Sequence, residues 1–235
     1  MRTRGDTDRL AEQRLASEEA AAPGRTPYSL GMAWRAFWRH PSPWLIGTTL
    51  VVVWAARFWA GGWRWTDALV PLVLVATFPV VEWLIHIAIL HWRPRRVAGV
   101  TVDSLLARKH REHHADPRDL PLVFIPWPVF PWLVPTLLAA SLLAFPRTGL
   151  GLSYLAVTMT LMMAYEWTHY LIHSDYRPKT RAYKAIWRNH RLHHYKNEHY
   201  WFSVTTSGTS DRLFGTYPDP ATVPTSPTAK NLHGP

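Results

Sequence analysis

The sequence predicts an all-α integral membrane protein, in which a bundle of about four transmembrane helices carries a histidine-rich helical cap that holds a dimetal site on the cytosolic side. Three observations lead to this fold class. The chain has four long apolar stretches, its Lys and Arg residues are concentrated on one side of them, and ten of its 13 histidines fall into four compact groups.

Composition narrows the class of protein. The 235 residues suffice for one substantial domain, and the absence of Cys excludes disulfides, thiolate metal ligands and cysteine nucleophiles. A net charge of +10 and 14 Trp would fit either a nucleic-acid-binding or a membrane protein, and the apolar stretches favour the membrane, so no nucleic-acid partner is predicted. No Walker, G-x-S-x-G or complete G-x-G-x-x-G motif is present, so no nicotinamide or flavin site is predicted.

The chain before the first apolar stretch is polar or mixed. Residues 1–27 lack the apolar core of a signal peptide, so they are expected to be a disordered or loosely helical cytoplasmic tail. Residues 28–43 interleave aromatic and basic side chains, which fits a segment on the membrane surface and equally a packed amphipathic helix. One membrane domain is expected over residues 28–217, followed by a disordered, proline-rich tail over 218–235.

Four apolar stretches follow, over residues 44–60, 68–90, 121–145 and 149–173. A spanning helix needs roughly 20 mostly apolar residues, and these lengths fit. The first stretch is short and carries Arg57, so we expect it to tilt or to extend that side chain to the interface. The third contains five prolines, so its first half is expected to be irregular and to become helical near Trp132.

Charge sets the predicted orientation. With the N-terminus inside, the inner segments are residues 1–43, 91–120 and 174–235, and these hold 23 of the 26 Lys and Arg residues. Such an excess is typical of cytoplasmic loops, so both termini are predicted to be cytoplasmic.

The histidine groups follow the second and fourth apolar stretches. Their patterns are H-x4-H, H-x2-H-H, H-x3-H and a second H-x2-H-H, made by His86 and His91; His110, His113 and His114; His169 and His173; and His190, His193 and His194. The topology places all four groups at the cytosolic end of the bundle, although they lie up to about a hundred residues apart.

Helical spacing explains how these groups can share ions. Residues three or four apart lie on one face of a helix, whereas the adjacent pair His113 and His114 diverges by about 100°, so one group can serve two ions. Ten imidazoles are too many for one ion and suit two ions with roughly five nitrogen ligands each. Imidazole binds iron, zinc, copper and nickel, and the spacing does not choose among them.

Two carboxylates lie near the histidines. Glu82 precedes His86 by four residues, and Glu166 precedes His169 by three, so each shares a face with its histidine. Each is a candidate to accept the other ring N–H of a ligand, or to pair with an Arg of the basic loops.

The four ordered histidine blocks, with the run "NEHYWFSVTTSGTSDRLFGTYPD" at 197–219, resemble the fatty acid hydroxylase / sterol desaturase superfamily over residues of about 75 to 219. Ser203 departs from the Gly that is frequent in that family, at a position that is not a ligand. The resemblance implies that the ten histidines bind two iron ions, which zinc can replace in the isolated protein, and that O2 is a co-substrate.

The same resemblance implies a reaction and its partners. The expected activity is hydroxylation of a lipid acyl chain in the membrane, with electrons from a separate ferredoxin or cytochrome that docks on the basic inner surface. Sterol or carotenoid hydroxylation or desaturation remains an alternative within the superfamily. A non-catalytic metal-binding or transport protein remains an alternative outside it.

Overall fold

The four apolar stretches form helices in the computed structural model, which describes residues 28–233; the predicted tail of residues 1–27 lies outside this range. Four helical segments are long and apolar enough to cross a membrane: Pro41–Ala60, Trp65–Leu90, Leu120–Leu143 and Thr148–His173. The first segment is α3 (Pro41–Ala60), and the fourth is α8 (Thr148–His173). The second consists of η1 (Trp65–Ala68), α4 (Leu69–Ile85) and η2 (His86–Leu90). The third consists of α6 (Leu120–Val123), η3 (Trp127–Val129) and α7 (Phe130–Leu143). The predicted four-span membrane bundle is confirmed by these helices.

The third stretch is irregular where the prolines predict it to be. A single helical turn, α6, is followed by the 3-10 turn η3, and the regular helix α7 begins at Phe130, close to Trp132. Proline lacks the backbone N–H that a helix interior needs, which explains why three of the five prolines precede α7 and a fourth, Pro131, lies in its first turn. Pro135 is inside α7.

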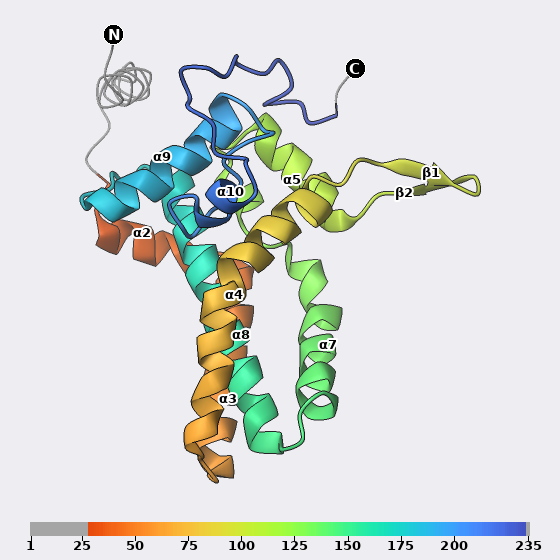
Figure 1. Ribbon diagram of the computed structural model, residues 1–235, viewed down its shortest axis with the longest axis vertical. Coiled ribbons are helices and arrows are strands. Elements are labelled where there is room, and N and C mark those ends of the chain that lie inside the picture. Colours follow the sequence, from red (N-terminus) through yellow and green to blue (C-terminus); the bar gives the residue numbers. More distant parts are fainter. Residues whose placement is uncertain (1–27, 234–235) are drawn as a thin grey trace.

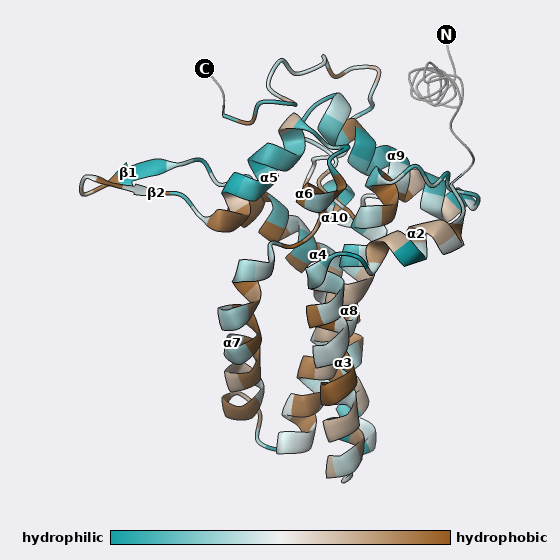
Figure 2. Cartoon of the chain, turned by 180° about the vertical axis from the view of Figure 1, so that it is seen from behind, coloured by the Kyte–Doolittle hydropathy of each residue, from teal (hydrophilic) through white to brown (hydrophobic). Residues whose placement is uncertain are grey.

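Helix α8 is the centre of the bundle and contacts α3, α4 and α7. The four long helices run along one axis, and the shorter helices gather at one end (Figure 1). Their apolar core includes Ile46 and Val53 of α3, Phe130 of α7, and Leu155 and Met159 of α8. Hydrophobic residues are concentrated in the four long helices, and hydrophilic residues at the end where the shorter helices gather (Figure 2). Apolar and polar residues are therefore separated along the long axis of the molecule.

Helix α2 (Leu30–Phe37) has features of both structures expected for its segment, a packed amphipathic helix and a segment on the membrane surface. It buries Ala33 and Phe37 against Tyr170 of α8, while Leu30 and Trp34 are about half exposed. One face therefore packs on the bundle, and the other is an exposed apolar and basic surface of the kind that lies at a membrane interface.

The cap consists of α5 (Leu105–Ala115), α9 (Arg181–Tyr195) and α10 (Thr209–Leu213), with a protruding hairpin of β1 (Arg95–Val97) and β2 (Val100–Val102) (Figure 1). Residues 218–233 differ from the expected disordered tail. They lack a helix or strand but pack on the cap, where Val223, Ala229 and Leu232 are buried and Ser226 N donates to the carbonyl of Lys196 at 2.7 Å.

The side chain of Arg57 does not extend to the surface of the protein, contrary to the expectation that it would reach outwards. Its side chain is fully buried and lies 3.0 Å from a carboxylate oxygen of Asp67, with further hydrogen bonds to Ser153 and to the carbonyl of Gly61. Arg147 also pairs with Asp67. The charge is therefore neutralised inside the protein, at the end of the bundle opposite the cap, which avoids the cost of an unpaired buried ion.

Candidate metal centre

The H-x4-H motif lies on a π-helical turn, η2. Five residues of an α-helix span about 500°, which would leave His86 and His91 about 140° apart. The backbone N–H of His91 instead donates to the carbonyl of His86 at 2.9 Å, the five-residue hydrogen bond of a π-helix. The wider turn brings the two rings to a centroid distance of 5.0 Å.

The other three groups use ordinary helical spacing. His169 and His173 end α8, while His110 and His114 share a face of α5, and His190 and His194 share a face of α9. Helices α5 and α9 begin at capping residues, Ser104 and Thr180, whose side chains accept the N–H of Ala107 and Tyr183. These caps fix where each helix starts and hence the height of its histidines.

All ten histidines converge as two groups of five. In each group, one ring nitrogen from every residue lies within 4.8 Å of those of the other four. The first histidine group comprises His86, His91, His110, His114 and His193, and the second comprises His113, His169, His173, His190 and His194. Each has the number of nitrogen donors that the sequence suggested for one ion, and either group could hold a metal ion.

Each H-x2-H-H motif contributes to both groups. His114 faces the first group and His113 the second, and the rings of His113 and His173 are 4.4 Å apart. On α9 the order is reversed, because His193 approaches His91 at 3.2 Å between Nε2 atoms while His194 belongs to the second group. The divergence of adjacent helical residues thus divides the histidines as predicted.

Backbone carbonyls orient several of the rings. The Nδ1 atoms of His86, His193, His114 and His173 lie 2.6, 2.8, 2.9 and 2.9 Å from the carbonyl oxygens of Phe202, Tyr200, Ala229 and Pro117 respectively. A carbonyl only accepts, so each Nδ1 carries the proton and each Nε2 keeps its lone pair for the centre. A backbone carbonyl leaves no signature in residue type, and sequence reasoning therefore missed these contacts.

Burial keeps the cap imidazoles neutral. It lowers the pKa of His110, His113, His190 and His194 well below the usual value, and neighbouring imidazoles lower it further. Burial likewise lowers the pKa of His114 to about 3. A neutral imidazole offers the lone pair that a metal ion requires.

Several buried ring nitrogens lack a protein partner. Among the described residues, Nε2 of His113 and Nε2 of His173 accept or donate no hydrogen bond. Leaving such a buried group unsatisfied costs about 1–3 kcal/mol. The Nε2 atom of His86 also faces Nε2 of His110 at 3.2 Å, although Nδ1 of His86 holds the proton. A shared cation satisfies these lone pairs, so the residues fit a metal centre.

The two candidate carboxylates do not contact the rings. Glu82 accepts hydrogen bonds from the backbone N–H groups of Val204 and Thr205 and from the Thr205 hydroxyl. Glu166 accepts from the hydroxyl of Ser42 and from the N–H of Ile125. The expected bonds to a ring N–H, or to an Arg, are therefore replaced by bonds that hold neighbouring chain segments. At His86 the carbonyl of Phe202 already occupies the Nδ1 position that Glu82 was expected to fill.

Sequence reasoning also missed Asp211, which belongs to none of the histidine motifs. Its buried carboxylate accepts the N–H of Phe202 and of Ser203, both at 2.9 Å, and the hydroxyl of Thr216 at 2.7 Å. Within the same loop, Trp201 adopts a φ of 55°, which a bulky residue keeps only when its surroundings hold it. Asp211 and Glu82 therefore position the loop of residues 200–205, whose carbonyls orient two histidines of the first group.

Comparison with known proteins agrees with the motif pattern. A family model described as fatty acid hydroxylase matches residues 71–216, which is more than half of the chain. No curated protein and no solved structure matches the chain. The matched range runs from α4 to just beyond α10 and contains both histidine groups and the 200–205 loop. The resemblance expected for residues of about 75 to 219 is thereby confirmed.

Proposed function

The chain belongs to the fatty acid hydroxylase family, and on that premise we propose that it is an O2-dependent lipid hydroxylase that uses two metal ions, functionally iron, to oxidise an acyl chain in the membrane. One observation carries the proposal: two buried groups of five imidazoles adjoin each other at one end of an apolar helical bundle. The family match by itself supports a membrane oxidoreductase of the hydroxylase and desaturase kind.

Each histidine group would hold one ion. Bound iron supplies the activation of O2 and the oxidation of a saturated C–H bond, which acid and base side chains cannot perform. The chain's own contribution is to bind and orient. Neutral imidazoles present Nε2 lone pairs, carbonyls such as that of Phe202 fix the ring planes, and burial excludes water from the reacting position.

The position of the histidine groups supports a lipid as the substrate. The motifs of α8 and of η2 occupy the ends of two candidate membrane spans, so a lipid could bring its chain to the histidines while its polar head stays hydrated. Residues 121–135 are our candidate for the entry, because Glu166 holds the N–H of Ile125 beside α8 while Trp127 and Trp132 remain exposed.

Electrons would come from a separate ferredoxin or cytochrome. The hairpin that follows His91 carries exposed cations at Arg93, Arg95 and Arg96. A basic surface beside the first group would steer an acidic donor towards the centre. The same proposal places both termini and the metal centre on the cytoplasmic side of the membrane.

A transport role fits less well than catalysis. A path through the membrane would need ionisable groups at intermediate depth. Residues 44–56, 68–81, 121–146 and 148–165 contain no Asp, Glu, Lys, Arg or His. Sterol or carotenoid oxidation shares the same centre and differs in the shape of the substrate cavity.

Lipid mass spectrometry tests the proposed reaction. Cells that express the chain should contain a membrane lipid with one added oxygen atom, which should be absent with His110→Ala or His193→Ala. A lipid that has instead lost two hydrogen atoms would identify desaturation.

Purified protein should carry close to two metal ions per chain. A metal content near zero after metal-replete expression, or full activity of either variant, would refute the dimetal proposal.

A further inference from the structure

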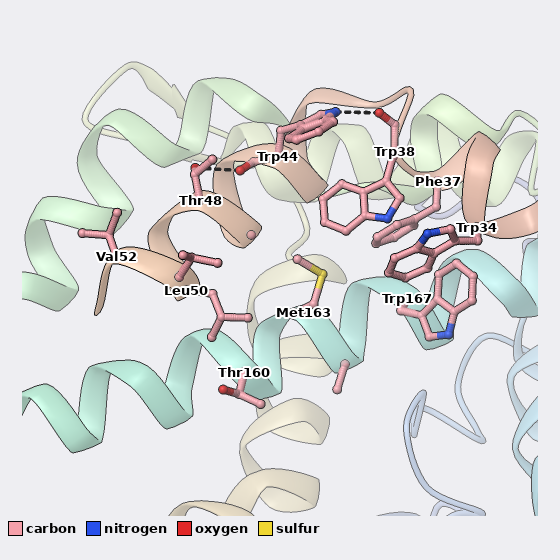
Figure 3. Close-up of a pocket in the computed structure, with 13 residues that line it drawn as sticks. Trp34, Phe37, Trp38, Trp44, Thr48, Leu50, Val52, Thr160, Met163 and Trp167 are labelled. Carbon is pink, nitrogen blue, oxygen red and sulfur yellow. Dashed lines mark hydrogen bonds between the residues drawn. The ribbon is translucent and has the colours of Figure 1, made fainter. Parts of the chain in front are cut away.

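An apolar groove runs along α3 and α8 and ends beside α2 (Figure 3). Its walls include Trp34, Phe37, Trp38, Trp44, Met163 and Trp167. Its volume of about 680 Å³ falls in the range of about 300–1,000 Å³ that is usual for small-molecule sites. The wall of α3 is open to the surroundings, since Val51 is 68% and Val52 65% exposed.

Both threonine hydroxyls of the groove and the indole N–H of Trp44 already have partners within the protein. The hydroxyl of Thr48 donates to the carbonyl of Trp44 at 2.7 Å, and that of Thr160 donates to the carbonyl of Ala156 at 2.8 Å. The indole N–H of Trp44 donates to the carbonyl of Trp38 at 2.6 Å. A peptide would therefore find few hydrogen-bond partners in the groove, whereas a hydrocarbon chain needs none.

The dimensions match one leaflet of a bilayer. Eight helical residues separate Trp44 from Val52, which corresponds to about 12 Å. The hydrocarbon core of a leaflet is about 15 Å deep, half of the usual core. The tryptophans gather at the end nearest α2 (Figure 3), and Trp favours the boundary between hydrocarbon and water.

The positively charged side chain of Arg35 lies at the tryptophan-rich end of the groove. A second hollow of about 440 Å³ shares Trp34, Trp38 and Trp44 with the groove and is completed by Arg35. The side chains of Arg35 and of nearby Arg39 are exposed. Guanidinium groups pair with phosphate oxygens in a bidentate manner, so a lipid whose chain lies in the groove could place its phosphate here.

We infer that this groove is a binding site for an anionic glycerophospholipid, with one acyl chain along α3 and α8 and the phosphate at Arg35. The site is distinct from the metal centre. Trp167 and His169 of α8 are two residues, or about 200°, apart around the helix, so the groove and the second histidine group lie on different faces. The bound lipid is therefore a structural or regulatory ligand and is not positioned for oxidation.

A second copy of the chain is a weaker candidate for the occupant. An isologous dimer through the groove would bring the same arginines of both copies together, and like charges oppose that contact. A stable interface would also need about 800 Å² from each partner. The lipid satisfies both the apolar wall and the cation.

Native mass spectrometry of the full-length, delipidated protein tests the inference, with phosphatidylglycerol and phosphatidylcholine as probes. One phosphatidylglycerol should bind per chain. Ala164→Phe fills the groove and should weaken binding about tenfold or more, because each displaced methylene loses apolar burial. Ala139→Phe, on the exposed surface of α7, is the matched control and should bind like the wild type.

Arg35→Gln should lower the preference for phosphatidylglycerol over phosphatidylcholine about fivefold, and Arg35→Lys should largely retain it. Metal content should stay unchanged in all four variants, which shows that they fold. Equal binding by Ala164→Phe and Ala139→Phe would overturn the inference. A photo-crosslinker at position 164 that captures residues 1–27 or a second copy in phosphatidylglycerol vesicles, rather than lipid, would also overturn it.

Discussion

Substitution of Asp211 by Asn should weaken one metal site and spare the other. The carboxylate accepts three hydrogen bonds, two on one oxygen and one on the other. An Asn amide keeps a single acceptor oxygen, so its NH2 group must face at least one N–H or O–H donor of the loop. The volume is unchanged, and the effect is therefore confined to charge and hydrogen bonding.

The magnitude follows from the lost contacts. A buried hydrogen bond to a charged group contributes about 1.5–3 kcal/mol, which corresponds to about 10- to 100-fold in an equilibrium constant. Loss of a group that orients a metal ligand typically weakens metal binding by the same factor of about 10–100. The loop carries the carbonyls that orient His86 and His193, which belong to the first group. The second group has its own carbonyl contact, from Pro117 to His173.

Metal content measured after equilibration with graded chelator tests this reasoning. Asp211→Asn should release one ion per chain at a chelator concentration about 10–100-fold below that needed for the other. Asp219→Asn is the control, because within residues 28–233 that exposed carboxylate accepts only the N–H of Ala221, in its own turn. Parallel loss of both ions, or release that matches the control, would refute the role of the loop.

Three further outcomes follow from other parts of the fold. Asp67→Asn leaves the buried guanidinium of Arg57 without its full counter-charge, so the unfolding temperature should fall while folded protein keeps its metal. Gly151→Ala would place a Cβ 1.8 Å from a backbone oxygen of α7, so α7 and α8 must separate at a cost of about 1–3 kcal/mol, whereas Gly149→Ala meets its nearest atom at 3.5 Å and should be tolerated. Arg96→Glu should slow reduction by an acidic electron donor and weaken the salt dependence of that rate.

Each of these outcomes has a clear contrary result. An unchanged unfolding temperature in Asp67→Asn would mean that Arg147 and the other partners of Arg57 suffice. Equal unfolding temperatures for the two glycine variants would contradict the close approach of α7 and α8. A donor rate that is unaffected by Arg96→Glu would place the docking surface away from the hairpin.

Much of the centre could be predicted because its determinants are local. The apolar stretches, the i, i+4 histidine pairs and the divergence of adjacent histidines depend on helix geometry alone. The structure adds what depends on chain segments distant in sequence. The bond from Val204 N to Glu82 spans 122 residues, and that from His114 to the Ala229 carbonyl spans 115. No local pattern encodes such pairings, and the second of them also explains why residues 218–233 lie on the cap.

The π-helical turn η2 could be predicted only in part. The sequence shows the unusual histidine spacing but not the backbone conformation that accommodates it. A spacing of five fits no face of an α-helix, so H-x4-H requires either a break in the helix or a wider turn. The structure has the wider turn, which extends α4 without a loop and keeps His86 against the 200–205 loop.

Each half of the chain supplies one histidine to the group that the other half mainly forms: His193 joins the first group, and His113 joins the second. The first group takes four histidines from the half that contains α4 and α5, and one from α9. The second group takes four histidines from α8 and α9, and one from α5. Neither half can complete a group alone, so a bound ion in either group ties α5 to α9. Because metal binding at such a site contributes folding free energy, the cap and its centre should form together. The doubled histidine of each H-x2-H-H motif is the feature that makes this exchange geometrically available, since one ring turns to each side.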